Sequence, residues 1–504
     1  MSEGSKLRPM LRPMLRPVLH PVLRPVLRPV LRGLLVPTLA AAIAGCTVGP
    51  DRPAIDLTAQ VGPAWSTADL DTARDRAEWR WWQDFGDAEM TALIEASLEG
   101  NLGVAQAAER LAAARARRGI DRARGLPTLD ASASYEYAES GNESASRTGP
   151  PPGTEQDVTS VGLLASWELD LWGRVRRLVE AADAEISFAA EDVAAARVAL
   201  AAEVAIEVIA IRSLDERRRI VERTLASDEA TLAITASRAR AGVATDLDRL
   251  RAERTLASRR AELPLLAADR RAAECRIAIL LGRPAATLSV AQADLPIPPP
   301  IPPLGVPADL LERRPDIRRA EQAFAAAHAR IGAAVAERYP KVTLSGTFAM
   351  SASDPGDLFD AQARTLGLGP TITLPLFTGG RIESTIDARE AEARAAHRAL
   401  EETVVRAVAE VETACARQAR AREQVIDLER ALMLAADAES LAQSLYRSGR
   451  SDFLNVIEAQ FERFAIEERL AQARTSLLDE SVRLVTALGG GWLGHGGATA
   501  LSQR

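Results

Sequence analysis

Two very long runs of helical sequence are each interrupted once, and in the same way. The segment RAGVATDLD spans residues 240–248, and the segment RSGRSDFLN spans residues 447–455. Their glycines, Gly242 and Gly449, lie 207 residues apart. The same offset recurs at two further pairs, Gly173 with Gly380 and Gly282 with Gly489. A constant offset over this length indicates that the chain contains two similar structural units.

The two units have recognisable borders. Upstream the offset becomes 213, because Pro127 matches Pro340, so the first unit holds six additional residues before Gly173. That region contains GNESASRTGPPPGTE, whose composition predicts a loop. The proline-rich stretch PIPPPIPPLGVP at 296–307 predicts an extended spacer between the units. We predict a processed leader at 1–45, a lipidated N-terminal segment at 46–86, a first repeat at 87–285, a proline-rich linker at 286–309, a second repeat at 310–488 and a C-terminal tail at 489–504.

Each unit is predicted to contain three helices. A first helix is expected at 87–124 and at about 315–338, and Pro315 suits a first helical turn. A very long helix is expected at 173–240 and 380–447, which at 1.5 Å per residue is about 100 Å of helix. A return helix is expected at 246–281 and 453–487. The glycine at each reversal suits the left-handed conformation that ends a helix, and a following Ser or Asp can cap the next one.

Two segments in each unit alternate between apolar and polar residues, which predicts β-strands. The apolar positions are Leu129, Ala131, Ala133, Tyr135 and Tyr137; then Val161, Leu163, Ala165, Trp167, Leu169 and Leu171; then Val342, Leu344, Phe348 and Met350; and last Leu366, Leu368, Ile372, Leu374 and Leu376. An apolar face kept over about ten residues fits a strand with lipid on one side and water on the other. A strand of a soluble sandwich would look the same in isolation.

The N-terminus looks like a targeting segment rather than part of the fold. Tetrads such as LRPM and LRPV, with a proline every fourth residue, exclude a regular helix. The apolar stretch GLLVPTLAAAIAG follows and is too short to span a bilayer. It leads to Cys46, and this arrangement resembles a bacterial lipoprotein signal, in which the cysteine carries the acyl chains. Thr47 favours the outer membrane, and an ordinary signal peptide is the alternative.

Four amphipathic strands are too few for a transmembrane barrel. An open sheet edge in lipid leaves unpaired backbone groups that cost several kcal/mol each. Several copies of the chain must therefore share one barrel. Two copies would give eight strands and a barrel filled by its own side chains, whereas three copies would give twelve strands and a lumen.

Composition and motifs exclude several classes of function. The net charge of −7 includes a strongly basic leader, so the remaining chain is acidic and gives no support for nucleic-acid binding. Cys275 and Cys415 lie in helical sequence and are expected to be two buried thiols, with a disulfide between them as the alternative. None of the common catalytic, phosphate-binding or metal-binding motifs is present. We therefore expect no enzymatic activity, metal or other cofactor.

Several motifs together resemble those of the TolC-like, NodT-type outer-membrane efflux factors, over residues 46–492. The motifs are CTVGP, WWQDF, LASWELDLWGRVRR, LLERRPDIRRAEQ, LPLFTGGR, YRSGRSDFLNVIEAQ and ALGGGW. The resemblance implies a mainly α-helical chain with transmembrane β-structure: a homotrimeric 12-stranded outer-membrane β-barrel, four strands per chain, continued by a long periplasmic α-helical barrel.

The same resemblance implies a function and partners. The chain would be a passive exit duct for small molecules such as drugs, toxic compounds or metal ions. It would work with a periplasmic adaptor and an inner-membrane pump of the RND type. The alternatives are the outer channel of a type I protein secretion system, a coiled-coil periplasmic adaptor and an envelope lipoprotein without a pore. The strand segments argue against the adaptor, which needs no lipid-facing barrel.

The resemblance also assigns roles to residues near the turns. Positions matching the family's periplasmic gate are Tyr446, Arg450, Asn455 and Glu458. Since a threefold assembly places three copies of a side chain around the axis, we expect Glu458 to line a carboxylate ring at the constriction. The alternative is that Glu458 pairs with a neighbouring arginine. Gly242 and Gly449 are expected to contact the adaptor, or else to be purely structural turn residues.

Two further motifs are given structural roles. The four arginines of LERRPDIRRAE are expected to serve helix-start chemistry and interhelical pairing rather than ligand binding. The aromatic residues Trp81, Trp82 and Phe85 are expected to pack the equatorial region. Trp167 and Trp172 are expected near a membrane interface.

Overall fold

The computed structural model describes residues 47–61, 65, 80–139, 155–243, 245–300 and 307–490. The leader, Cys46 and most of the C-terminal tail lie outside these residues. The described residues form two compact units: unit 1 comprises those that fall within Met1–Asp51, Ile120–Glu180 and Ala329–Arg389, and unit 2 comprises those that fall within Arg52–Gly119, Ala181–His328 and Glu390–Arg504. These units cut across the sequence repeats, because each repeat contributes two strands to unit 1 and a helical hairpin to unit 2.

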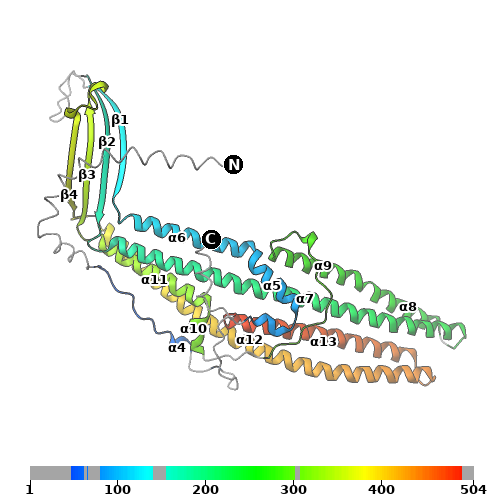
Figure 1. The fold of residues 1–504 in the computed structure, drawn as a ribbon. Helices are drawn as coiled ribbons and strands as arrows, with labels where there is room; N and C mark the ends of the chain where they lie inside the picture. Colours follow the sequence, from blue (N-terminus) through cyan, green and yellow to red (C-terminus); the bar gives the residue numbers. More distant parts are fainter. Residues whose placement is uncertain are drawn as a thin grey trace. The chain divides into compact units, whose positions relative to one another are not determined.

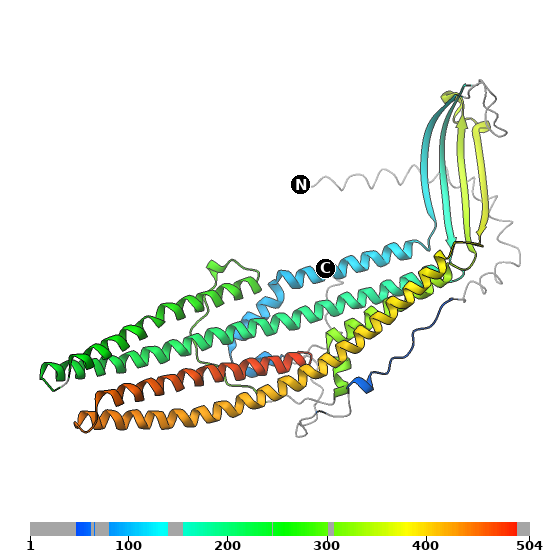
Figure 2. The same ribbon diagram turned by 180° about the vertical axis from the view of Figure 1, so that it is seen from behind.

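Unit 1 contains one antiparallel sheet in the order β1-β2-β3-β4 (Figures 1 and 2). Its strands are β1 (Thr128–Glu139), β2 (Glu155–Leu169), β3 (Lys341–Ala352) and β4 (Arg364–Thr373). The first repeat supplies β1 and β2, and the second repeat supplies β3 and β4. All four predicted strands are therefore present.

The strand register places the predicted apolar residues of all four strands on one face of the sheet. Directly opposed pairs include Leu129 with Ala165, Leu163 with Phe348, and Phe348 with Leu366. Side chains opposite one another in a sheet point to the same face. This apolar face is open in the single chain, since Leu366 and Leu368 are 72% and 77% exposed.

Two strands end earlier than the alternation predicted. β2 ends before Leu171, because the Asp170 carboxylate accepts hydrogen bonds from the backbone N–H groups of Val175 and Arg176 and so caps the next helix. β4 ends at Thr373, before Leu374 and Leu376. Pro375 lacks the N–H group that a continuing ladder would need.

Aromatic residues lie at the end of the sheet where β2 terminates. The Trp167 indole donates to the carbonyl of Gly125 over 2.9 Å. The Trp172 indole donates to the carbonyl of Pro340 over 2.8 Å and its ring stacks on Tyr339, with centroids 4.9 Å apart. This arrangement suits an aromatic belt at a membrane interface, which stays a prediction.

Two helical hairpins dominate unit 2. Hairpin 1 consists of α7 (Arg174–Arg240), α8 (Asp246–Arg260) and α9 (Glu262–Leu280), and hairpin 2 consists of α12 (Arg381–Arg447) and α13 (Phe453–Ala487). α7 and α12 each contain 67 residues, and their bounds differ by the same 207 residues as the glycines. The duplication therefore predicts both helices closely. Within the described residues, no helix is both long and apolar enough to cross a bilayer.

Two helices predicted as continuous are broken. The first separates into α5 (Ala88–Gly100) and α6 (Leu102–Ala123). At the break, the Asn101 side chain accepts from the Val104 N–H and donates to the carbonyl of Leu280. The return helix separates into α8 and α9 at Ala261, because Pro264 cannot donate to the carbonyl of Arg260. α13 is unbroken, as predicted.

Shorter elements complete the described fold. They are α4 (Thr58–Val61), η1 (Trp81–Phe85), η2 (Ala285–Thr287), η3 (Pro307–Asp309), α10 (Leu310–Arg313), α11 (Pro315–Ala336), η4 (Pro355–Asp357) and η5 (Ala361–Ala363). The aromatic residues of η1, Trp81, Trp82 and Phe85, are buried in a core that includes Val204 and Val208 of α7. The packing expected for these three aromatic residues is thus confirmed, while their place in an equatorial region stays a prediction.

The two described cysteines are free thiols. Cys415 is buried, and burial raises the pKa of its thiol to about 11. Cys275 is only partly buried, so the prediction of two buried thiols is wrong for this residue. The alternative of a disulfide between them is also wrong.

Candidate functional site

The turns of the two hairpins have the same backbone geometry. Gly242 and Gly449 adopt φ angles of +71° and +74°, in the left-handed region that favours glycine. In the first turn the N–H groups of Gly242 and Val243 donate to the carbonyls of Ala239 and Arg238. The N–H groups of Gly449 and Arg450 make the same pair of hydrogen bonds, to the carbonyls of Tyr446 and Leu445. Each turn is a Schellman motif that ends a helix of 67 residues.

The helices that follow the two turns begin differently. Thr245 caps α8 in a capping box with Asp248. Asp452 occupies the equivalent N-cap position of α13, but its side chain accepts no hydrogen bond from the first turn of that helix. The expectation that Ser or Asp caps the returning helix is therefore wrong for both hairpins, because Thr245 is the cap in hairpin 1 and no side chain caps α13 in hairpin 2. The Asp452 backbone is nevertheless extended, as a cap requires.

Tyr446 ties the ends of the two hairpins together. It is buried, in a cluster with Ala252 of α8 and with Phe453, Val456 and Ile457 of α13. The Arg238 guanidinium of α7 lies 4.5 Å from the centre of the Tyr446 ring and donates to its carbonyl oxygen over 3.0 Å. A cation over an aromatic face is attracted by the ring quadrupole, so this contact holds α7 against α12.

A second contact between the hairpins involves a buried charge pair. Arg259 of α8 and Asp228 of α7 are each at most 5% exposed in the side chain, and their nearest charged atoms lie 3.5 Å apart. The Arg259 guanidinium also lies 3.3 Å from the centre of the Phe464 ring of α13. Burial raises the pKa of Asp228, Arg259 opposes this effect, and Glu439 adds to it. The net direction is upward, so Arg259 only partly compensates for burial of the carboxylate.

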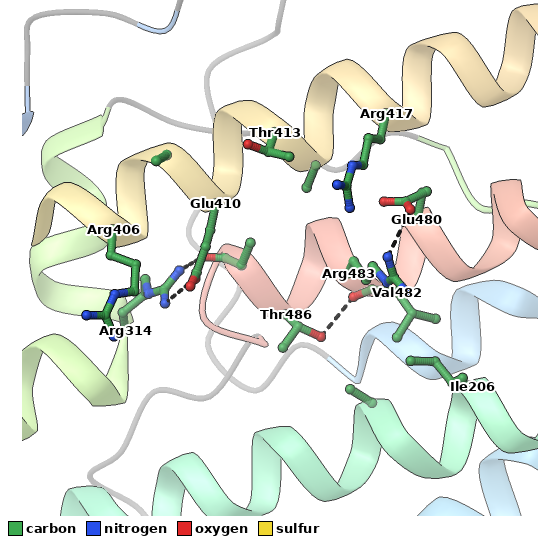
Figure 3. A pocket seen from close by; sticks show the side chains of 14 residues that line it. Ile206, Arg314, Arg406, Glu410, Thr413, Arg417, Glu480, Val482, Arg483 and Thr486 are labelled. Carbon is green, nitrogen blue, oxygen red and sulfur yellow. Dashed lines mark hydrogen bonds and ion pairs between the residues drawn. The ribbon is translucent and has the colours of Figure 1, made fainter. Parts of the chain in front are cut away.

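The arginine-rich segment LERRPDIRRAE, which spans α10 and the start of α11, has a structural role, as predicted. The Arg314 guanidinium donates to the carboxylates of Asp316 and Glu410, each over 2.7 Å, and to the carbonyl of Ala487 over 2.9 Å. It thereby joins the start of α11 to α12 and to the end of α13. Figure 3 shows Arg314 and Glu410 at one end of a cavity of about 530 Å³ between α7, α12 and α13.

Comparison with known proteins agrees with this architecture. The profile of the family described as outer membrane efflux protein matches residues 93–283 and 306–490. The chain belongs to the outer membrane efflux protein family. It is 32% identical to outer membrane protein OprJ of Pseudomonas aeruginosa over 463 residues, covering 90% of this chain and 95% of OprJ. It is also 32% identical to nodulation protein T of Rhizobium leguminosarum bv. viciae, covering 90% and 93%.

A solved structure of the outer-membrane channel OprN gives the same result at the level of the fold. It superposes with a TM-score of 0.81 at 33% identity, covering 89% of this chain and all of OprN. The resemblance drawn from the motifs is thus confirmed, and so is the TolC-like fold, in which each chain supplies part of a β-barrel and of an α-helical barrel. This outer membrane efflux protein is an efflux channel component of the outer membrane that extends into the periplasm. Members of its family are channel proteins.

The other three predicted gate residues of this outer membrane efflux protein lie at the surface of hairpin 2. Arg450, Asn455 and Glu458 are exposed, whereas Tyr446 is buried. The Asn455 amide donates to the Ser451 hydroxyl over 2.9 Å. Among the described residues no ion pair includes Glu458. Its carboxylate is therefore exposed to solvent in the single chain, and the role of these residues in a gate stays a prediction.

Sequence reasoning missed the ties between the hairpins. Tyr446, Phe453 and Phe464 correspond, at the offset of 207, to Ala239, Asp246 and Ala257. An aromatic residue that occurs in only one of the two repeats could have predicted these contacts, because it indicates a packing surface that the other repeat lacks. In the structure the rings of Tyr446 and Phe464 contact Arg238 and Arg259.

Proposed function

We propose that three copies of this chain form one outer-membrane duct with a shared 12-stranded barrel. The observation that carries the proposal is the open four-stranded sheet with an apolar face. β1 and β4 are its edges, and an edge in lipid would leave backbone groups unpaired. Pairing β4 of one copy with β1 of the next removes every edge, and twelve strands leave a lumen.

The mass of the detergent-extracted particle and its single-channel conductance test this proposal. We expect a particle of three chains that inserts into planar bilayers and conducts ions. A single-chain particle, or a trimer that never conducts, would contradict it. The second outcome would favour an envelope lipoprotein without a pore.

The duct is proposed to receive small molecules from an inner-membrane pump of the RND type through a periplasmic adaptor, and to need no cofactor. The exposed turns around Gly242 and Gly449 support adaptor contact, because nothing lies within 4 Å of the position that a Cβ would occupy at either glycine. Another backbone could therefore approach closely. Recovery of an adaptor and pump with the tagged trimer from cross-linked cells tests the assignment, and recovery of a peptide-exporting transporter instead would favour type I secretion.

Glu458 is proposed to form a ring of three carboxylates at the periplasmic constriction. Its exposure in the single chain supports this role. Three like charges around a narrow axis favour cations. Glu458→Ala should raise the conductance or reduce cation selectivity in planar bilayers, and a variant unchanged in both would exclude the ring.

The anchor is proposed to be a lipid on Cys46, beside which Thr47 favours retention in the outer membrane. Metabolic labelling with an alkyne analogue of palmitate should mark the protein but not a Cys46→Ser variant. Equal labelling of the two proteins would exclude this site.

A further inference from the structure

The N-terminal segment TVGPD, residues 47–51, packs at the junction between the sheet and the long helix α7. We call these five residues the anchor segment, because they directly follow Cys46. The Val48 N–H donates to the carbonyl of Trp172 over 3.1 Å. Val48 and Gly49 are half-buried, and the whole anchor segment belongs to unit 1. The segment is therefore part of a folded unit rather than a free tether.

The anchor segment packs against two glycines that leave room for it. Gly173, between β2 and α7, has a φ of +80°, and a Cβ there would lie 2.8 Å from Cγ2 of Thr47. Gly49 of the segment packs on Gly332 of α11, since a Cβ on Gly49 would lie 2.5 Å from the Gly332 Cα. Carbon atoms in contact are normally about 3.5–4.0 Å apart. A side chain at either contact would therefore displace the anchor segment.

A buried arginine holds the far end of the anchor segment. The Arg177 side chain of α7 is 7% exposed, and its guanidinium donates to the Pro50 carbonyl over 3.5 Å and to the Asp51 carboxylate over 3.3 Å. It also donates to the Glu180 carboxylate over 2.9 Å. A Cβ on Gly332 would lie 2.8 Å from Nε of Arg177, so a side chain at this position would push the guanidinium away. One helix from each repeat thus holds the segment.

The duplication separates the effect of the anchor segment from that of the backbone. Gly380 is the counterpart of Gly173 at the offset of 207 and has a φ of +83°. Gly119 of α6 is the counterpart of Gly332 at the offset of 213. Among the described residues, no atom lies within 4 Å of the position that a Cβ would occupy at either counterpart. The same repeat positions are therefore crowded only in the copies that contact the anchor segment or the arginine beneath it.

We propose that the anchor segment fixes the acylated end of the chain beside Trp172, and that Gly173 and Gly332 are the positioning residues that admit it. The proposal rests on the lipid on Cys46 proposed above. Neighbouring Cα atoms are about 3.8 Å apart, so the acylated residue stays within one peptide unit of Thr47.

Docking of the segment joins two features that set the depth of a protein in a membrane. One is the acyl chain, and the other is the pair of stacked rings of Trp172 and Tyr339 at the end of the sheet. If the five residues were an unrestrained tether, each would add up to about 3.6 Å between the lipid and the rings. The docked segment removes this freedom, so the acyl chains leave the protein at one defined place.

The two repeats supply matched variants for a test of docking. Gly173→Ala and Gly380→Ala place the same side chain at nearly the same left-handed φ, but only the first crowds Thr47. Gly332→Ala and Gly119→Ala form a second pair within helices, and again only the first meets a neighbour. Gly173→Ala and Gly332→Ala are therefore the crowded variants, whereas Gly380→Ala and Gly119→Ala are the open variants that serve as their controls.

Hydrogen exchange at the Val48 N–H, measured by mass spectrometry on the purified mature protein, reports docking directly. We expect exchange at Val48 to be about tenfold or more faster in the crowded variants, because the hydrogen bond to the Trp172 carbonyl is lost. The open variants should change it by less than about twofold. Exchange in β2 and α7 should stay the same in all four variants, which distinguishes undocking of the segment from unfolding of unit 1.

A photoactivatable palmitate analogue with a diazirine group, fed to the cells, shows where the acyl chains lie. After irradiation, we expect cross-links to peptides of the same chain that contain Trp172 or Tyr339. These cross-links should be about threefold or more fewer in the crowded variants and unchanged in the open variants, because undocking redistributes the acyl chains. The total incorporation of the analogue should be equal in all proteins, since the leader rather than the folded segment directs acylation.

Three outcomes overturn the inference. The first is exchange at Val48 in the unmodified protein that is as fast as in an unstructured peptide. The second is equally faster exchange in Gly173→Ala and Gly380→Ala, which would assign the effect to backbone strain. The third is an undocked segment with unchanged cross-links, which would show that docking does not place the lipid. Absence of the analogue from every protein would instead overturn the lipid on Cys46, and exchange at Val48 distinguishes that case because it needs no lipid.

Discussion

Hairpin 1 and hairpin 2 reverse direction with the same backbone geometry, but different side chains stabilise the two turns. Gly242 and Gly449 share a left-handed conformation and the same hydrogen bonds. Hairpin 1 begins its return with the capping box of Thr245, whereas hairpin 2 buries Tyr446 and Phe453 against its neighbour. The two repeats therefore keep the same backbone at the turn but differ in their side chains. Those of hairpin 1 stabilise the start of its own return helix, whereas those of hairpin 2 pack against the neighbouring hairpin.

The largest expected effect comes from filling the space beside a turn glycine. We expect Gly449→Trp to abolish efflux while leaving trimers intact, because a bulky side chain would keep an adaptor away from the turn. A non-glycine residue in the left-handed conformation costs about 1–2 kcal/mol, too little to unfold such long helices. Efflux by cells that also contain the cognate adaptor and pump measures the effect, with trimers checked by mass.

Gly449→Ala and Gly242→Trp sharpen the comparison of the two turns. The alanine variant has the same backbone strain without the bulk and should retain most efflux. The Gly242→Trp variant shows whether the adaptor needs both turns or only that of hairpin 2. Normal efflux by Gly449→Trp would leave this glycine a purely structural role.

The next largest effect concerns the buried charge of hairpin 1. Arg259→Met should destabilise the protein by about 3–5 kcal/mol at pH 7, because removing one partner leaves the Asp228 carboxylate buried without compensation. The folded-state pKa of Asp228 is already raised, and without Arg259 it rises further. A raised carboxyl pKa costs stability above the unfolded-state pKa, and the cost disappears as pH falls below it. The stability lost in Arg259→Met should therefore be smaller near pH 4 than at pH 7.

The matched control is Ile466→Met at the repeat-equivalent position, which is buried but uncharged. A change between apolar residues of similar volume should cost less than about 1.5 kcal/mol and show no added pH dependence. Chemical denaturation of both variants at pH 4 and pH 7 provides the comparison. Equal losses for Arg259→Met at the two pH values would contradict a raised pKa at Asp228.

The sequence predicted what depends on repetition and periodicity, and it missed what depends on distant partners. The offset of 207 located α7 and α12, and alternation located the four strands and their shared apolar face. The break at Asn101 was missed because one of its partners, the carbonyl of Leu280, lies 179 residues away in sequence. The contact between Arg238 and Tyr446 was missed for the same reason, since the residues are 208 positions apart.

The candidate site was also predicted only in part from the sequence. The two turns were located because a left-handed backbone favours glycine, which is visible in the sequence. Tyr446 was named as a gate residue, but its burial between the hairpins was not predicted, because periodicity cannot show which helix covers a given face. Arg259 and Asp228 are ordinary charged residues in a charged helical sequence, and only their burial distinguishes them.

The smallest expected effect separates the two helix starts. Thr245→Ala removes the capping box of α8 and should cost about 1 kcal/mol, since one orphan N–H group of the first turn loses its acceptor. Asp452→Ala removes a side chain that makes no capping hydrogen bond, so it should cost only a few tenths of a kcal/mol. Hydrogen exchange in the first turns of α8 and α13 measures both changes without requiring global unfolding. Faster exchange confined to α8 in Thr245→Ala, with α13 unchanged in Asp452→Ala, is the expected result. If Asp452→Ala speeds exchange in α13 as much as Thr245→Ala speeds it in α8, both side chains stabilise their helix starts to the same extent. The difference between the hairpins would then be only the aromatic contacts of Tyr446 and Phe453.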